Sequence, residues 1–374
     1  MTFHDENEYL IHLLSCAIHG TAPEPAPASI SLEKVFSIGA EHEVANIAYM
    51  AVQRLPEKPD PELMSRWREF YYNAMKRDVM QRRARDEILD ALHAHGIPTL
   101  EVQGSVVKRY YPQSHWRMMS DLDIIIPADR LNEADGIMQS LGFSTENPKG
   151  VEVDAKRGNI AVELHTEFFA SIDATRNALD QPFFHAVLAE DGTAVVSDTL
   201  FYLFHWLHTI KHCVHYGIGV RRIIDLYYLE IALRDEADQA YIDGVLKENG
   251  FYETKQKLLA VKEHWFGDGQ PDPETAVLEQ NIMDAGNHGN EDIAVRNRFD
   301  REQAEGKRFV RFKYFVAFLF PSKQAVYDRY PFCERHHYPI VLCWIHRFNC
   351  ALFSAESWKK LGTVFTRLRG RKKY

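Results

Sequence analysis

The stretch that decides the fold is VQGSVVKRYYPQSHWRMMSDLDIIIP, residues 102–127. The segment before it, IPTLEVQ, has the composition of a short strand, and Gly104 and Ser105 follow directly. SVVKRYY then suggests a helical turn, and DLDIIIP suggests a second strand that Pro127 ends. The change from helical spacing to short apolar runs predicts an α/β block in this part of the chain.

Asp121 and Asp123 lie one residue apart at the start of the second strand. Because side chains alternate along a strand, both carboxylates point to one face and Leu122 points to the other. Two carboxylates on one face repel each other unless a cation lies between them, and hard oxygen ligands suit Mg²⁺. A glycine where a strand meets a helix lets backbone N–H groups approach an anion. A cation site beside an anion site is what a nucleoside triphosphate with its metal requires.

A third carboxylate is found in AVELH, in which Ala161, Glu163 and His165 share one face of a strand. Glu163 can reach the aspartate pair if its strand lies next to theirs. The three carboxylates would then form one group.

Four regions follow from the pattern along the chain. Residues 1–95 and 171–296 carry apolar side chains at spacings of three and four, which is typical of helices. Residues 96–170 hold the strand signals, and residues 297–374 contain a further helical segment with a basic tail. The polar, proline-bearing stretch at 269–292 is expected to be a linker or an exposed loop.

The composition limits the class of protein. The chain has 374 residues, 45% of them hydrophobic, which is enough for two or three packed units, and a formal charge of −9. That net negative charge argues against a protein whose whole surface binds nucleic acid. The tail KKLGTVFTRLRGRKKY is basic, so it is either a solvated end or a local contact for nucleic acid or anionic lipid.

The cysteines and the most apolar run bear on the cellular compartment of the protein. The five cysteines are odd in number and include no CxxC pair, so we expect reduced thiols in a cytoplasmic protein. The run YPIVLCWIHRFNCALF is interrupted by His346, Arg347 and Asn349. It is too short to span a bilayer, so no stable membrane insertion is expected.

A row of histidines advances by three and four residues along one expected helix, at positions 205, 208, 212 and 215. Such a row faces either solvent or a cleft. A zinc site is a weaker interpretation, since no neighbouring acidic base accompanies the row. Asp225 in RRIIDL can as easily form a structural ion pair with Arg221 or Arg222 as serve a function.

The order GS, DLD and VEL resembles the DNA polymerase β-like nucleotidyltransferase superfamily. HGIPTLEVQGSVVKRYYPQSHWRMMSDLDIIIP, VELH and LHTIKHCVHYGIGVRRIIDLYYL resemble more narrowly a bacterial family of uncharacterised nucleotidyltransferases. Many members have lysine before the glycine, where this chain has Gln103. The resemblance implies an α+β fold, with a small mixed-sheet nucleotidyltransferase core flanked by N-terminal and C-terminal helical regions.

The resemblance also implies a reaction. Asp121, Asp123 and Glu163 would be catalytic and would hold Mg²⁺, with two ions expected. An acceptor hydroxyl, deprotonated with help from Glu163, would attack the α-phosphorus of a triphosphate such as ATP and expel pyrophosphate. The expected nucleotide-binding residues are Gly104, Ser105, Lys108, Arg117, Ser120, Lys211 and His212.

Two alternatives to this enzyme remain open at this stage. One is a non-catalytic nucleotide-sensing or interaction protein on the same fold. The other is a peripheral membrane protein that docks through its last segment. The acceptor, the nucleobase and the oligomeric state do not follow from the sequence.

Overall fold

The structure is a computed structural model that describes residues 3–146, 152–167 and 186–287, together with residues 289, 323, 326, 335 and 339–344. The chain divides into two compact units, Met1–Asn290 and Glu291–Tyr374. Apart from the positions named above, the C-terminal segment expected at 297–374 and its basic tail lie outside the described residues. The fold described below is that of the first unit.

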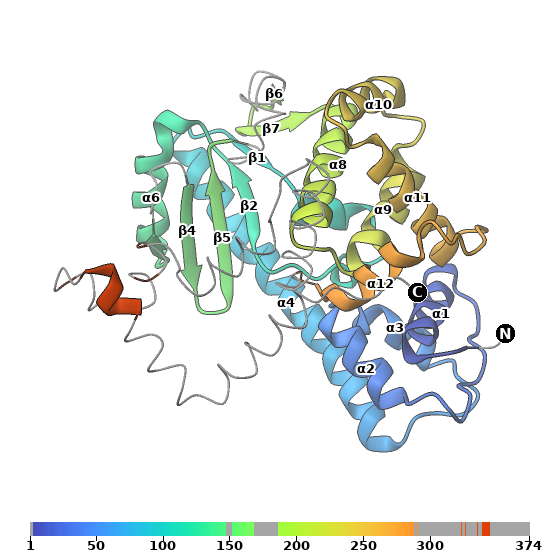
Figure 1. Cartoon of the computed structure of the whole chain (residues 1–374). Helices are drawn as coiled ribbons and strands as arrows, with labels where there is room; N and C mark the ends of the chain where they lie inside the picture. The colour runs from blue at the N-terminus through green and yellow to red at the C-terminus, as the bar shows by residue number, and fades with distance from the viewer. Residues whose placement is uncertain are drawn as a thin grey trace. The chain divides into compact units, whose positions relative to one another are not determined.

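Seven strands form one mixed sheet in the order β3-β4-β5-β2-β1-β7-β6 (Figure 1). They are β1 (Thr99–Glu101), β2 (Leu122–Ile125), β3 (Ser144–Glu146), β4 (Glu152–Arg157), β5 (Ile160–His165), β6 (Ala186–Leu188) and β7 (Thr193–Val196). The central strand β2 runs antiparallel to β1 and parallel to β5. The strands expected before the Gly-Ser step, at the aspartates and at VELH are confirmed as β1, β2 and β5. The sheet continues beyond residue 170, because β7 pairs in parallel with β1.

Two helices cover one face of this sheet, α4 (Pro61–Ala94) and α6 (Leu131–Ser140). The apolar face of β2, with Leu122 and Ile124, is buried against residues of α4 such as Ile88. Asp60 caps the start of α4, and Gly96 follows its end at φ 68°, a left-handed value that suits glycine. The opposite face of the sheet carries the acidic side chains.

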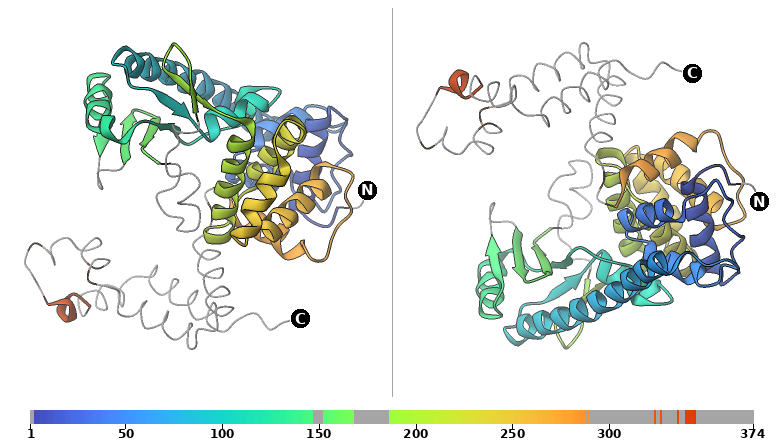
Figure 2. Two further views of the ribbon diagram at one scale, coloured as in Figure 1. Left: turned by 90° about the horizontal axis from the view of Figure 1, so that it is seen from above. Right: turned by 90° about the horizontal axis from the view of Figure 1, so that it is seen from below.

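Most of the other described helices form a second layer beside the sheet. They are α1 (Glu6–His19), α2 (Leu32–Glu41), α3 (Ala45–Val52), α8 (Asp198–His215), α9 (Val220–Leu233), α10 (Gln239–Glu248), α11 (Tyr252–Phe266) and α12 (Ala276–Ala285). One apolar core joins the N-terminal helices to α8, α9 and α11. Figure 2 shows α4 running from the sheet to α1–α3. On the acidic side of the sheet, Phe204 of α8 packs with Ile125 of β2.

The expectation of a loop at residues 269–292 is wrong for its central part, which forms α12. Ile282 and Ala285 of this helix are buried. The prolines before the helix and the glycines on both sides of it favoured a loop, although the residues between them carry a short apolar pattern of helical spacing.

Two other expectations concern thiols and membranes. The described cysteines, Cys16, Cys213 and Cys343, are free. In the described part of the chain, no helix is both long enough and apolar enough to cross a membrane.

Candidate active site

The acidic group lies where β2 and β5 run side by side in parallel. Their register places Asp123 opposite Glu163 and Ile125 opposite His165. The condition for Glu163 to reach the aspartates, that its strand neighbours theirs, is therefore met. The side chain of Asp123 is 19% exposed and that of Glu163 is 40% exposed, so Glu163 is the more accessible of the two from solvent.

The structure adds His165 to this group. Its Nε2 atom lies 3.2 Å from Oδ1 of Asp123 and 3.3 Å from Oε2 of Glu163. One ligand atom from each of these three residues lies within 4.8 Å of the other two. Asp121 is not part of this triad, although its charge interacts with it. The alternation in VELH already placed His165 on the face of Glu163, but sequence reasoning did not assign it a role.

Electrostatic repulsion is strong within the group. Partial burial and the neighbouring carboxylates of Asp123 and Glu163 raise the pKa of Asp121 to about 6. Burial alone would lower the pKa of His165, but its hydrogen bonds to Asp123 and Glu163 raise it to about 10. The hydrogen bond to His165 in turn lowers the pKa of Glu163. The carboxylates thus exceed the positive charge available beside them, as expected of a cation site, and their oxygens are the ligands that Mg²⁺ prefers.

The Gly-Ser step forms a tight corner between β1 and α5 (Gly104–Val107). Gln103 adopts φ 57° and ψ −129°, a left-handed conformation that is strained for a residue with a side chain. A Cβ atom on Gly104 would lie 2.5 Å from Nη1 of Arg117 and 2.7 Å from Sδ of Met119, so only glycine fits. The hydroxyl of Ser105 donates to the carbonyl of Val102 at 3.1 Å.

Arg117 makes a buried ion pair with Asp225 of α9. Its Nε and Nη2 donate to the two carboxylate oxygens at 3.1 and 3.0 Å. The side chains are only 3% and 0% exposed, and the hydroxyl of Tyr111 also donates to Asp225, at 2.6 Å. Burial alone would raise the pKa of Asp225, yet Arg117 and Arg222 lower it to about 2. Of the two ion pairs considered for Asp225, the one with Arg222 is present at 3.9 Å, and Arg117 is the closer partner.

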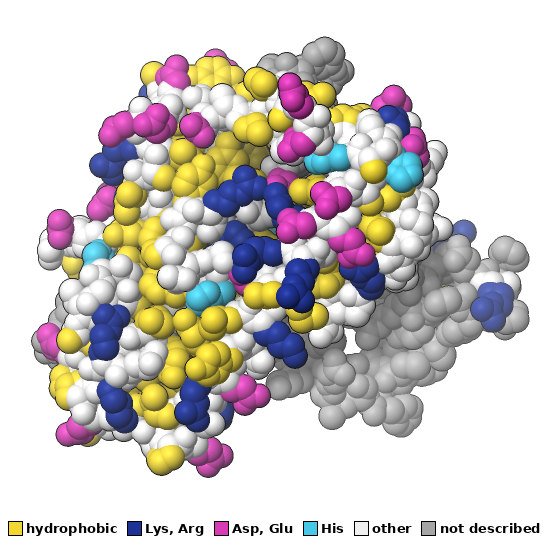
Figure 3. Space-filling model, turned by 180° about the vertical axis from the view of Figure 1, so that it is seen from behind, with side chains coloured by type: hydrophobic (Ala, Val, Ile, Leu, Met, Phe, Trp, Pro, Cys, Tyr) yellow, Lys and Arg dark blue, Asp and Glu magenta, His cyan; other side chains and the backbone are white. Residues whose placement is uncertain are grey.

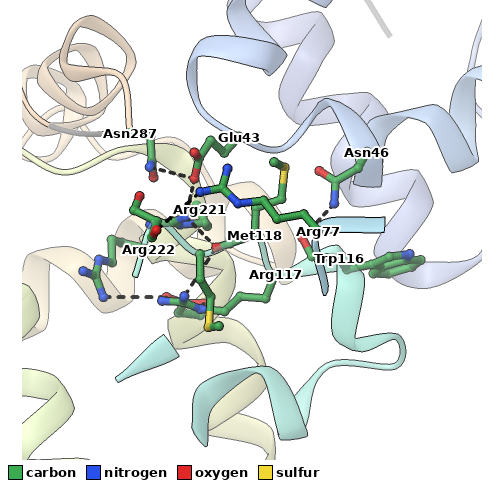
Figure 4. Close-up of polar contacts among 12 residues, drawn as sticks. Glu43, Asn46, Arg77, Trp116, Arg117, Met118, Arg221, Arg222 and Asn287 are labelled. Atoms are coloured by element: carbon green, nitrogen blue, oxygen red, sulfur yellow. Dashed lines mark hydrogen bonds and ion pairs between the residues drawn. The ribbon is translucent and has the colours of Figure 1, made fainter. Parts of the chain in front are cut away.

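Arg221 and Arg222, in the first turn of α9, have different surroundings. Arg221 pairs with Glu43 and donates to the carbonyl of Met118 at 2.6 Å, as Figure 4 shows. Arg222 lies 3.2 Å from Nε2 of His208 through Nη2 and 3.9 Å from the carboxylate of Asp225 through Nη1. Among the described residues, that Nη1 atom is buried without a hydrogen-bond partner. In the sequence, the two adjacent arginines before IIDL were the feature that could have pointed to these contacts.

Lys108 lies on the other face of the sheet from the acidic group. Its Nζ donates to Asp78 of α4 at 2.6 Å. It lines a cavity of about 390 Å³ whose wall includes Leu122, which points away from Asp123. Figure 3 shows the side of the molecule opposite to Figure 1, where Lys and Arg side chains gather near the middle of the face.

The other expected nucleotide-binding residues are Ser120, Lys211 and His212. The carbonyl of Ser120 accepts from Nη2 of Arg77 at 3.5 Å. Lys211 and His212 are half-buried on α8, and burial lowers the pKa of each, that of His212 to about 4. His205 is buried, so the histidine row does not face solvent throughout. Within the described residues, the triad on β2 and β5 is where metal-ligating atoms converge, and the histidine row forms no such group.

The chain was compared with curated protein sequences and with solved structures. No curated protein sequence matched the chain. Two solved structures resemble parts of it, each at 14% identity: the solution structure of the antibiotic-resistance factor ANT(2'')-Ia and the crystal structure of ANT(2'')-Ia in complex with adenylyl-2''-tobramycin. The first has a TM-score of 0.35 and covers 50% of this chain and 97% of its own. The second has a TM-score of 0.34 and covers 47% of this chain and 99% of its own.

The sequence model of one family matches residues 28–267, which include all of the described sheet, the acidic group and helices α8 and α9. The chain therefore belongs to the family of uncharacterised nucleotidyltransferases.

Proposed function

We propose that this protein transfers a nucleoside monophosphate from a nucleoside triphosphate to a hydroxyl group, in a reaction that depends on Mg²⁺. The observation that carries the proposal is the register of β2 and β5, which sets Asp123 opposite Glu163 with Asp121 two residues away. Membership of a nucleotidyltransferase family supports the reaction class.

Asp121, Asp123 and Glu163 are the residues proposed to hold Mg²⁺. The raised pKa of Asp121 supports this assignment, because burial and the carboxylates of Asp123 and Glu163 raise it more than the nearby arginines lower it. Bound Mg²⁺ would supply charge neutralisation for the triphosphate and the leaving pyrophosphate. In other respects the protein acts by positioning the reactants.

The proposed reaction forms one bond and breaks one. The acceptor oxygen bonds to the α-phosphorus, and the bond from that phosphorus to the bridging oxygen of the leaving pyrophosphate breaks. The acceptor proton passes to Glu163, whose 40% exposure leaves it accessible.

The triphosphate needs cations on the side of α8 and α9. Lys108 and Arg117 are committed to Asp78 and Asp225 by close contacts, so they are less suited to this role. Arg222 lies farther from a carboxylate, at 3.9 Å from Asp225, and its other close contact is the neutral ring of His208 at 3.2 Å. We therefore assign the main phosphate contact to Arg222, near Lys211 and His212.

Incubation of the purified protein with host lysate and each of the four α-labelled triphosphates tests the proposal. The wild type and the exposed-site control Asp129→Asn should transfer label to an acceptor in the presence of Mg²⁺, whereas Asp123→Asn should not. Equal behaviour of wild type and Asp123→Asn would contradict the proposal. Triphosphate binding without transfer would favour the nucleotide-sensing alternative.

A further inference from the structure

We infer that the Nε2 atom of His165 is a metal ligand beside Asp123 and Glu163, and that the site therefore binds Mn²⁺ more tightly than Mg²⁺. The inference rests on the proposed function, because the ion belongs to the same active site. It differs from the all-carboxylate set that the sequence predicts, since one donor is nitrogen.

The spacing of the three donor atoms fits one ion. Ligand bonds of about 2.1 Å at right angles place two donor atoms about 3.0 Å apart, and opposite ligands lie about 4.2 Å apart. The observed separations from His165 to Asp123 and Glu163 are 3.2 and 3.3 Å. The Nε2 atom of His165 thus stands close to the separation expected of neighbouring ligands from each carboxylate oxygen, and all three donor atoms lie within 4.8 Å of one another.

The backbone holds the triad in this arrangement. Glu163 and His165 are two residues apart on β5, so alternation directs both to the same face. The parallel pairing with β2 brings Asp123 directly opposite Glu163. Because all three residues lie on paired strands of the sheet, little rearrangement is needed to bind an ion.

The surrounding charge favours a cation with more than one positive charge. Strand pairing places Asp154 of β4, Glu163 of β5 and Asp123 of β2 in one row across the sheet. Asp121 adds a further carboxylate close enough to be affected by Asp123 and Glu163. A single imidazolium at His165 cannot neutralise this row, whereas a divalent ion can offset most of it.

The donor set bears on the relative affinities of Mn²⁺ and Mg²⁺. Mg²⁺ strongly prefers oxygen ligands and keeps much of its water, whereas imidazole suits transition metals. Mn²⁺ accepts both carboxylate oxygen and imidazole nitrogen. We expect the dissociation constant for Mn²⁺ to be at least about tenfold lower than that for Mg²⁺, and most of this difference to disappear without His165.

Pulsed electron paramagnetic resonance on the Mn²⁺-loaded full chain, free of any histidine tag, tests the inference without measuring activity. Nitrogen bound to Mn²⁺ modulates the electron spin echo. The wild type and the matched control His95→Gln, at an exposed histidine, should show this modulation. His165→Gln should lack it and should bind Mn²⁺ at least about tenfold more weakly, with little change in Mg²⁺ affinity.

The outcomes separate this inference from the proposed function. Nitrogen modulation that His165→Gln removes, in a protein that transfers no label, would support the ligand assignment and contradict the enzyme. Label transfer without nitrogen modulation would leave the enzyme intact and overturn the assignment, making His165 a bridge between two carboxylates. Absence of Mn²⁺ binding, or modulation that persists in His165→Gln, would also overturn the assignment. Circular dichroism of each variant shows whether it is folded.

Discussion

Replacing Asp121 by asparagine is expected to make the metal-free protein more stable at pH 7. The carboxylate of Asp121 has a pKa of about 6 in the folded protein, against an ordinary value of 3.8, because of burial and of repulsion by Asp123 and Glu163. The folded state therefore binds the proton more tightly than the unfolded state. The free energy of unfolding falls as the pH rises from 3.8 to about 6 and stays low above that range.

The size of the effect follows from the two pKa values. A pKa raised from 3.8 to about 6 corresponds to about 3 kcal/mol, at ~1.4 kcal/mol per pKa unit. Asp121 is partly exposed, so solvent screening reduces the expected gain to about 2–3 kcal/mol. For a cooperative unit the size of Met1–Asn290, this is a rise in melting temperature of roughly 3–5 °C.

Urea denaturation followed by circular dichroism, in the presence of a chelator, measures the difference between variant and wild type at pH 7 and at pH 4. Asp129→Asn, at an exposed aspartate outside the acidic group, is the matched control and should change little. Addition of Mn²⁺ should stabilise the wild type more than Asp121→Asn. A variant less stable than wild type at pH 7, or a gain of equal size at both pH values, would refute the reasoning.

Three further predictions concern the surroundings of the acidic group. Arg117→Ala should lower the free energy of unfolding by roughly 3–5 kcal/mol in denaturant titrations, because it leaves Asp225 buried without its close cation; a loss below about 1 kcal/mol would contradict this. In calorimetry, Gly104→Ala should cost about 1–3 kcal/mol because its Cβ would collide with Arg117, whereas Gly136→Ala, with open space around its Cβ, should be neutral or stabilising by up to about 1 kcal/mol. Without metal, the stabilisation that protonated His165 contributes should be complete below pH 6.5 and should be lost as the pH rises towards 10. The difference in free energy of unfolding between wild type and His165→Gln should therefore shrink over this range, and a difference that grows would contradict the raised pKa of His165.

Local patterns in the sequence were sufficient for the chemistry of the central strands. Alternation in DLD and VELH correctly grouped side chains by face, and the Gly-Ser corner was recognisable from residue types alone. The parallel pairing that sets Asp123 opposite Glu163 could not be deduced, because strand order depends on contacts between distant segments. Short strands such as β7 (Thr193–Val196) carry too few residues for a period to be visible.

The ion-pair partners of charged residues were the feature hardest to predict from the sequence. Lys108 pairs with Asp78, 30 positions away, and Arg117 with Asp225, 108 positions away. Such pairs arise from the packing of helices against the core, which no local pattern encodes. A basic residue near a phosphate motif can therefore be either a ligand contact or half of a buried ion pair, and only the fold separates the two.

The most direct test of nucleotidyl transfer uses triphosphates labelled at two positions, in a mixture with acceptor, Mg²⁺ and wild-type protein. With the α-phosphate labelled, the label should move onto the acceptor; with the γ-phosphate labelled, it should appear in pyrophosphate and never on the acceptor. Asp123→Asn should do neither. Transfer of the γ-label to the acceptor, or α-transfer that survives in Asp123→Asn, would contradict the account.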